Sequence, residues 1–299
     1  MGTWQEALRQ RFPRTLLDEP MSRHTTFRIG GPADAYVQAV SLQELRELVS
    51  FARSHDVPVF LLGRGSNLLI LDGGIRGIVL RLSGEFSAIR FAGLRVWAGA
   101  GARLPALVLA CAEAGLAGAE PLAGIPGTVG GALVMNAGTR EGEIGDIVRS
   151  VRVFDGMALE EAELGPKELR FGYRSSNLEN RLILGATLEL KRGSKVDILR
   201  RIHELQQKRL QTQPVHTYNV GSTFKNPPGR FVAKLIEEAG LKGLRCGGVA
   251  VSEKHANFIE NDRNGTAKDV LALVELLRAR VRERFGVELE LEMKVAGEA

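Results

Sequence analysis

A short glycine-rich segment, residues 62–69, has the residue types that bind a phosphate group through the main chain. Between Leu62 and Leu69, it contains Gly63, Arg64, Gly65, Ser66, Asn67 and Leu68. Two near-adjacent glycines let the backbone approach a ligand closely, and the N–H groups and short polar side chains supply hydrogen-bond donors. The segment is neither a Walker loop nor a complete dinucleotide fingerprint, because the required lysine and third glycine are missing. The alternative for this segment alone is a tight turn between two strands.

A second glycine-rich segment, residues 124–138, has five glycines among fifteen residues. Each glycine costs about 0.5–1 kcal/mol relative to alanine in a regular element, so something other than chain packing is expected to compensate. An extended, flat ligand lying against bare backbone would do so, and an ordinary glycine-rich connection is the alternative. Two such segments in one half of the chain favour the ligand.

The composition is that of a globular protein. The 299 residues are 44% hydrophobic and 25% charged, which argues against a disordered or fibrous chain. A formal net charge of +5 is mild and evenly spread, so a small anionic ligand would explain it and no nucleic-acid partner is expected. No apolar run reaches the roughly 20 residues of a membrane-spanning helix. Residues 1–14 lack the apolar centre of a signal peptide.

The cysteines and histidines predict neither a disulfide nor a metal site. Cys111 and Cys246 are isolated in the sequence, and the five histidines show no metal-binding spacing. Two unpaired thiols suit a reducing compartment, so we expect a cytoplasmic protein without a bound metal. No feature of the sequence points to a protein partner.

Helices and strands are both expected along the whole chain. Ser41 and Glu44 form a capping box for a helix over 41–55, and Thr266 with Asp269 caps a helix over 267–285 that stops at Gly286. Asp155 followed by glycine predicts a hairpin, because this dipeptide tolerates a turn with positive φ. Further helices are expected over 104–114, 196–210 and 231–239, and strands over 57–62, 68–71, 77–82, 88–91, 95–98, 150–154, 158–164, 182–190 and 287–296.

The resulting fold class is α+β. We place a domain boundary near residues 193–195, where a strand-rich and glycine-rich half meets a more helical one.

Motifs along nearly the whole chain resemble, in order, those of the UDP-N-acetylenolpyruvoylglucosamine reductases, flavoenzymes of peptidoglycan precursor synthesis. Any one motif is weak, but their ordered set is highly specific. The matching segments are 24–33, 63–67, 124–138, 171–176, 221–227, 251–259 and 292–297. The resemblance implies a two-lobed FAD-binding domain of the vanillyl-alcohol-oxidase (PCMH) type over 1–194, with lobes of about 1–82 and 83–194. It also implies an α+β substrate-binding domain over 195–299.

The same resemblance implies the reaction and the cofactor contacts. UDP-N-acetylglucosamine enolpyruvate is reduced to UDP-N-acetylmuramate with NADPH as reductant and non-covalently bound FAD as the carrier of the hydride. The first segment contributes Gly63 to Leu68 to the cofactor site. The second contributes Gly124, Ile125, Gly127, Thr128, Gly130, Gly131, Asn136 and Ala137.

Three residues match the catalytic positions of the family. Arg174 matches the arginine that holds the substrate carboxylate, whose negative charge grows on hydride addition. Ser222 matches the proton donor, with Lys225 as a cation that stabilises the developing alkoxide. Glu292 matches a glutamate that either orients Arg174 or is protonated and donates a hydrogen bond, and we favour the protonated form. On pattern alone, Glu292 would be one of several glutamates on the exposed face of a strand.

Substrate contacts are expected from Tyr173, Arg174, Lys225 and Asn226, the last two reaching the UDP or sugar portion.

The match departs from the family at three places. Lys294 stands where an arginine is usual, so the position keeps the charge and loses the bidentate fork. Thr212 stands where a lysine is expected, and Lys208 or Arg209 is the replacement we consider. The chain resembles the shorter type of the family, which lacks an inserted tyrosine-bearing loop.

Two other functions stay open from the sequence. One is an oxidase or dehydrogenase built on the same cofactor domain, which would need a catalytic base that Ser222 and Arg174 do not supply. The other is a non-catalytic UDP-sugar binding protein, which would be colourless when purified, whereas a flavoenzyme is yellow.

Overall fold

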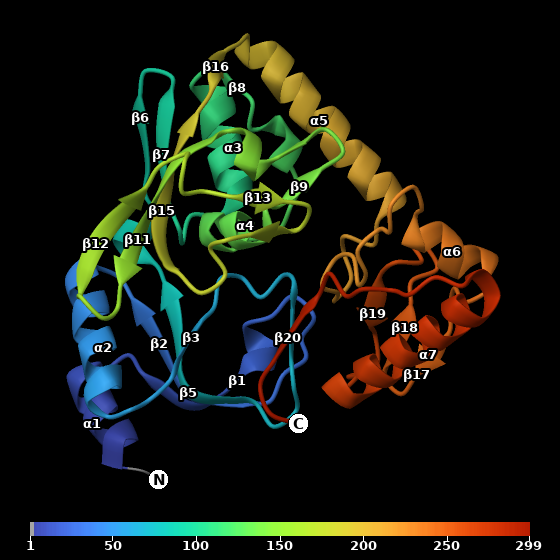
Figure 1. Cartoon of the computed structure of the whole chain (residues 1–299), viewed down its shortest axis with the longest axis horizontal. Coiled ribbons are helices and arrows are strands. Elements are labelled where there is room, and N and C mark those ends of the chain that lie inside the picture. Colours follow the sequence, from blue (N-terminus) through green and yellow to red (C-terminus); the bar gives the residue numbers. More distant parts are fainter. Residues whose placement is uncertain (1–2) are drawn as a thin grey trace. The chain divides into compact units, whose positions relative to one another are not determined.

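The computed structural model describes residues 3–299 and divides the chain into two compact units (Figure 1). Unit 1 contains the N-terminal residues up to Leu16 together with Tyr36–Arg64 and Ile78–Arg209. Unit 2 contains Leu17–Ala35, Gly65–Gly77 and Leu210–Ala299. A shift in composition can indicate only a division of the chain into consecutive stretches. It cannot indicate that two N-terminal segments belong to the same unit as the C-terminal residues. The domain limits 1–194 and 195–299 stay a prediction.

Unit 1 is built on a five-stranded antiparallel sheet in the order β12-β11-β15-β7-β6 (Figure 1). Buried side chains of three helices, among them Leu107, Leu133 and Ile198, form one core with this sheet. The strands are β6 (Ile89–Ala92), β7 (Arg95–Gly99), β11 (Val148–Asp155), β12 (Glu160–Leu164) and β15 (Leu182–Glu189). The helices are α3 (Leu104–Glu113), α4 (Val129–Met135) and α5 (Lys195–Thr212).

A second sheet has the strand order β1-β2-β5-β3. It comprises β1 (Leu16–Pro20), β2 (Pro32–Ala39), β3 (Val59–Leu61) and β5 (Ile75–Leu82), with β3 and β5 parallel. The N-terminal helices are α1 (Thr3–Arg11) and α2 (Leu42–Ser54). Ser41 accepts a hydrogen bond from the N–H of Glu44 at the start of α2, as predicted, while the Glu44 carboxylate accepts from the N–H of Val40.

Unit 2 contains a three-stranded antiparallel sheet, β17-β18-β19, with two helices beside it (Figure 1). These elements are β17 (Arg245–Cys246), β18 (Val249–Val251), β19 (Ile259–Asn261), α6 (Val232–Glu238) and α7 (Ala267–Phe285). The predicted capping box of Thr266 and Asp269 starts α7, and Gly286, in the left-handed region with φ of 64°, ends it. Strands β4 (Leu68–Ile70) and β20 (Lys294–Ala296) pair in parallel.

The remaining elements are short. The ribbons are β8 (Leu116–Ala117) with β16 (Lys191–Arg192), β9 (Gly138–Thr139) with β10 (Gly142–Glu143), and β13 (Phe171–Gly172) with β14 (Ser175–Ser176). The 3-10 helices are η1 (Met21–Arg23), η2 (Gly84–Ser87), η3 (Glu120–Leu122) and η4 (Ile144–Asp146).

Two predicted elements differ from the structure. The strand expected over 287–296 is shortened to β20, and before it only an isolated bridge joins Leu291 to Phe224. The hairpin at Asp155 forms, but its loop spans residues 156–159, and the left-handed residue is Leu159 with φ of 58°. The Asp155 carboxylate stabilises this longer loop by accepting two backbone N–H groups.

Among residues 3–299, none of the helices combines the length and the apolar character needed to cross a membrane.

Candidate functional site

The first glycine-rich segment joins β3 to β4, as the sequence predicts. Gly65 adopts a φ of +62°, and a Cβ there would lie 2.7 Å from the carbonyl oxygen of His24 and 2.9 Å from the Cα of Thr25. The Gly65 carbonyl accepts a hydrogen bond from the N–H of Thr26. Only glycine fits this position, because the left-handed backbone and the close approach act together.

The turn leaves main-chain donors available to a ligand. Within the described part of the chain, the N–H groups of Gly63, Arg64 and Gly65 donate no hydrogen bond. Successive free N–H groups at a turn form a concavity that binds anions. The segment therefore fits the diphosphate of a dinucleotide.

Positive charge gathers beside this turn in unit 1. Burial lowers the pKa of Arg64, and repulsion from Arg103 and then Arg81 lowers it further. None of the three forms an ion pair with a carboxylate anywhere in residues 3–299. Arg103 and Arg81 lie close enough to Arg64 to affect its pKa, and an anion bound at the turn would offset this repulsion. Arg81 lies in β5 and Arg103 directly precedes α3, and neither is among the site residues predicted from the sequence.

The two glycine-rich segments meet in unit 1. A Cβ on Gly63 would lie 2.7 Å from the Oγ1 atom of Thr128, the residue that caps the N-terminus of α4. A ligand on the first segment thus has the start of the second segment beside it.

Half of the second segment is helical rather than an open loop. Residues Val129–Met135 form α4, and Gly130 permits its packing, since a Cβ there would lie 3.1 Å from the Cβ of Ala100. The first N–H groups of α4 are already used, because Val129 and Gly130 donate to the carbonyls of Ala102 and Ala100. Before the helix, Ile125 donates its N–H to the Leu122 carbonyl and the Gly127 carbonyl accepts from Leu104, so within residues 3–299 the N–H groups left for a ligand are those of Gly124, Gly127 and Thr128.

Asn136 ends α4 and organises the turn that carries Arg174. It is 2% exposed and left-handed, with φ of 45°. Its Nδ2 donates to Glu143 at 2.6 Å and to the Gly172 carbonyl at 3.0 Å, and its Oδ1 accepts from the N–H of Gly145 at 3.0 Å. Its side chain therefore joins protein segments to one another.

Arg174 occupies the second position of a two-residue turn between β13 and β14. Its φ of 53° lies in the left-handed region, which is uncommon for a bulky residue and is found preferentially at functional sites. Its guanidinium donates to the Gly138 carbonyl at 3.1 Å, pairs with Glu143 at 3.5 Å and stacks over the exposed ring of Tyr173. The side chain is only 18% exposed, so the charge is held in one place.

Ser222 lies in unit 2 on a segment that Asn257 fixes. Asn257 is 3% exposed, its carbonyl accepts the N–H of Thr223, and its side chain exchanges two hydrogen bonds with the main chain of Phe224. Asn257 is not among the site residues predicted from the sequence. Its role is to set the backbone on which Ser222 stands.

Glu292 lies next to this segment and differs from the neighbouring glutamates. Its N–H donates to the Thr223 carbonyl at 2.9 Å, and its own carbonyl accepts from the Asn67 side chain at 3.0 Å. Glu288 and Glu290 are exposed, whereas Glu292 is partly buried. The structure thus brings Glu292, Asn67 and the residue after Ser222 together within unit 2.

Lys225 and Asn226 have partners inside the protein. Lys225 forms an ion pair with Glu290, whose carbonyl accepts the Lys225 N–H. The Asn226 side chain accepts the N–H of Val232 at the start of α6. Their expected contacts with substrate stay predictions.

The predicted site residues are divided between the units. Unit 1 contains Gly63, Arg64, Tyr173, Arg174 and the residues of 124–137, and unit 2 contains Gly65, Ser66, Asn67, Leu68, Ser222, Lys225, Asn226 and Glu292.

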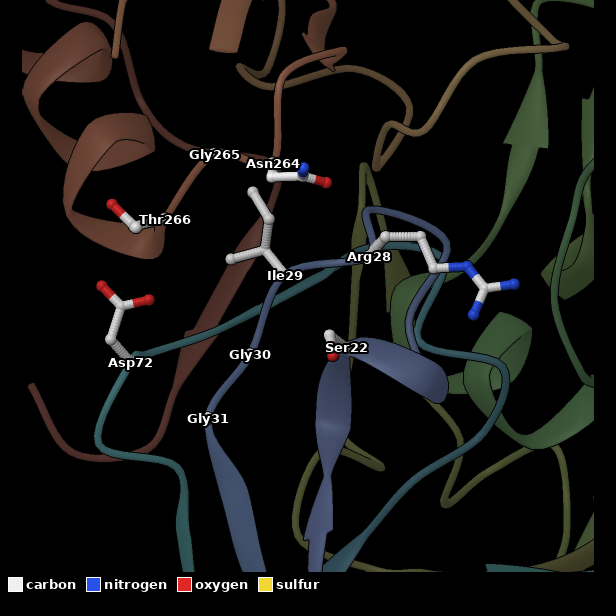
Figure 2. A pocket seen from close by; sticks show the side chains of 9 residues that line it. All are labelled: Ser22, Arg28, Ile29, Gly30, Gly31, Asp72, Asn264, Gly265 and Thr266. Carbon is white, nitrogen blue, oxygen red and sulfur yellow. The ribbon is translucent and has the colours of Figure 1, made fainter. Parts of the chain in front are cut away.

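A shallow hollow in unit 2 contains none of these residues (Figure 2). Its rim includes Asp72, whose carboxylate accepts the N–H groups of Ala267 and Lys268 and so occupies the N-terminus of α7. Figure 2 shows the Arg28 guanidinium turned away from Asp72. The residues that line the hollow are Ser22, Arg28, Ile29, Gly30, Gly31, Asp72, Asn264, Gly265 and Thr266.

Comparisons with known proteins agree with this geometry. A family model described as "FAD binding domain" matches residues 33–158, and one described as "UDP-N-acetylenolpyruvoylglucosamine reductase, C-terminal domain" matches residues 213–296. The reductase of Rubrobacter xylanophilus is 45% identical over 300 residues, covering 97% of this chain and 98% of that protein. The reductase of Lachnoclostridium phytofermentans is 44% identical over 293 residues, covering 95% and 94%.

A solved structure gives the same result. The crystal structure of the reductase from Thermus caldophilus matches with a TM-score of 0.80 and 43% identity, over 94% of this chain and 98% of that chain. The predicted fold class, an FAD-binding domain with an α+β C-terminal domain, is confirmed. The chain belongs to the UDP-N-acetylenolpyruvoylglucosamine reductase family.

Proposed function

We propose that Arg174, Ser222 and Glu292 carry out the reduction of UDP-N-acetylglucosamine enolpyruvate to UDP-N-acetylmuramate. Membership of the family gives the overall reaction, the FAD cofactor and NADPH as reductant. Bound FAD supplies the chemistry that carries a hydride from NADPH to the vinyl carbon. The roles of the individual residues are our proposal. The observation that supports it most is the hydrogen bond from Glu292 to the residue after Ser222.

Arg174 binds the substrate carboxylate in this proposal. Hydride addition pushes negative charge into that carboxylate, and a guanidinium stays charged at any working pH. The partly buried position of Arg174 strengthens the attraction, because few waters screen it. Glu143 and Gly138 hold the guanidinium in place before the substrate arrives.

Ser222 donates the proton to the carbon next to the one that receives the hydride. A serine hydroxyl is a weak acid, so the developing alkoxide needs a neighbouring donor or cation. Lys225 is already paired with Glu290, which reduces its effect. We therefore assign the donor role to a protonated Glu292, as for other carboxylic acids held neutral near an oxyanion.

The cofactor lies along the two glycine-rich segments in the proposal. The free N–H groups of residues 63–65, with Arg64, Arg81 and Arg103, receive the diphosphate. Residues 124–128 lie beside the rest of the dinucleotide, and Tyr173, Lys225 and Asn226 contact the UDP-sugar. We place the protein in the cytoplasm, where NADPH is available and where its two free cysteines stay reduced.

An anaerobic absorption experiment tests the function. The purified chain is expected to be yellow, to lose its visible absorbance with NADPH, and to regain it with the enolpyruvyl sugar. A colourless protein would indicate a UDP-sugar binder. A yellow protein that NADPH bleaches but the enolpyruvyl sugar does not recolour would indicate an oxidase or dehydrogenase of the same cofactor fold.

Ser222→Ala tests the assignment of the proton donor. Flavin reduction by NADPH is expected to stay near normal, because this step needs no proton at the substrate carbon. Reoxidation by the enolpyruvyl sugar is expected to slow by about 10²–10⁴-fold, the usual contribution of a general acid. Equal reoxidation rates in the two proteins, followed by stopped-flow absorbance, would remove Ser222 from the mechanism.

A further inference from the structure

Arg209 is a partly buried cation to which the proposed mechanism gives no role. It lies in the last turn of α5, and burial lowers its pKa. Its Nε atom is buried and has no hydrogen-bond partner among residues 3–299. The arginines earlier in α5 differ, since Arg200 pairs with Asp197 and is 67% exposed.

The side chain of Arg209 lies against the start of the second glycine-rich segment. A Cβ on Gly124 would lie 3.3 Å from the Cδ atom of Arg209, and both residues belong to unit 1. Gly124 is the first residue of that segment, and its N–H group donates no hydrogen bond within residues 3–299. The guanidinium is therefore held beside that backbone.

Among residues 3–299, no carboxylate forms an ion pair with Arg209. No carboxylate contributes to its altered pKa, for which burial is the only cause. A partly buried charge without a partner lowers the stability of the fold, and such charges are found at sites where a ligand brings the opposite charge. An anionic ligand group on residues 124–128 would complete the site.

The two cationic centres of unit 1 suit different parts of a dinucleotide. Arg64, Arg81 and Arg103 stand together beside free N–H groups, which fits two phosphates. Arg209 is a single, partly buried cation with an unpartnered Nε atom, which fits one delocalised negative charge. Two-electron reduction places such a charge on the pyrimidine edge of the isoalloxazine ring.

We propose that Arg209 stabilises the anionic reduced form of FAD and so raises the reduction potential of the bound cofactor. The inference rests on the proposed FAD site along the two glycine-rich segments. In this proposal the positive charge of Arg209 acts on the flavin, and Arg209 does not contact the UDP-sugar.

The reduction potential of the FAD-loaded protein tests this role. The variants are Arg209→Met, which keeps the length and removes the charge, and Arg209→Lys, which keeps the charge and loses the planar fork. Arg200→Met is the matched control, because it removes one exposed charge from the same helix. Potentials are read from visible absorbance against a reference dye.

Arg209→Met is expected to weaken the binding of reduced relative to oxidised FAD by at least about tenfold, which lowers the potential of a two-electron couple by about 30 mV. Arg209→Lys is expected to lie between this variant and the unmodified protein, and Arg200→Met to match the unmodified protein. An unchanged potential in Arg209→Met with FAD fully bound would overturn the proposal. So would an equal fall in Arg200→Met.

A second measurement, the affinity for UDP, tests whether Arg209 instead binds the phosphates of the substrate. If Arg209 served the phosphates of the substrate, Arg209→Met would weaken the binding of UDP and leave the potential unchanged, which also overturns the proposal. If Arg209→Met does not fold, Arg209→Gln is read by the same potential. Failure of the unmodified chain to bind FAD would instead count against the proposed function.

Discussion

Replacing Asn136 separates a structural role from a cofactor contact, because all the polar atoms of its side chain bond to the protein. Asn136→Ala removes the donors to Glu143 and Gly172 and the acceptor for Gly145. The residue is 2% exposed, so water cannot replace these bonds fully. The change should therefore lower stability rather than affinity for FAD.

The magnitude follows from the bonds that are lost. A buried polar group left without a partner costs about 1–3 kcal/mol, and of the two main-chain groups affected only Gly145 is partly buried, whereas Gly172 is exposed to water. The left-handed backbone of residue 136 adds about 1 kcal/mol for alanine. The expected loss is about 2–4 kcal/mol, and each kcal/mol lowers Tm by about 2–4 °C in a unit of this size. Asn136→Gly should recover the backbone part, because glycine adopts positive φ without cost.

The assay combines thermal unfolding with the two half-reactions. Glu143 loses its link to α4, so Arg174 is held less firmly and reoxidation by the enolpyruvyl sugar is expected to slow. Flavin reduction by NADPH should stay near normal. A Tm within 2 °C of the unmodified protein, together with weaker binding of FAD, would refute the reasoning and indicate that Asn136 faces the cofactor.

Three further predictions concern the charged groups and the thiols. Glu292→Gln should keep far more reoxidation activity than Glu292→Ala, because an amide still donates a hydrogen bond; equal losses in stopped-flow traces would count against a protonated Glu292. Arg81→Gln and Arg103→Gln should each weaken FAD binding about three- to tenfold and make the binding less dependent on salt, whereas the control Arg90→Gln on β6 should change neither. Fluorescence titration measures the affinity for FAD. If Arg81→Gln and Arg103→Gln had no larger effect than Arg90→Gln, the three arginines would have no role in binding the cofactor. Burial, with a smaller contribution from Glu120, raises the pKa of Cys111 to about 12. At pH 8 a thiol reagent should therefore modify Cys246 in the folded protein and react with Cys111 only after unfolding. Reaction of both thiols at the same rate in the folded protein would show that Cys111 is not protected.

Local signals in the sequence predict most of the helices. The capping box of Thr266 and Asp269, and the glycine at 286, define α7 to the residue. Such signals act over a few neighbouring residues, so they can be read without tertiary contacts. The helix α4 escapes this reasoning because Gly130 and Gly131 lower its propensity, while packing against Ala100 makes it form.

The site is only partly readable from the sequence. The segment around Gly65 is predicted because its glycines and polar residues are adjacent. The cluster of Arg64, Arg81 and Arg103 could not be predicted, since its members are separated along the chain and approach only in the fold. The alternating pattern of glutamates does not distinguish Glu292 from Glu290. Only the fold distinguishes them, because the main chain of Glu292 forms long-range hydrogen bonds with Thr223 and Asn67.

A crystal structure of the FAD-loaded chain tests the central claim most directly. We predict that the diphosphate lies against the N–H groups of residues 63–65 with the Arg64 guanidinium near it, and that the isoalloxazine ring lies along residues 124–128. Density for the dinucleotide elsewhere, or a diphosphate bound away from both glycine-rich segments, would contradict the account.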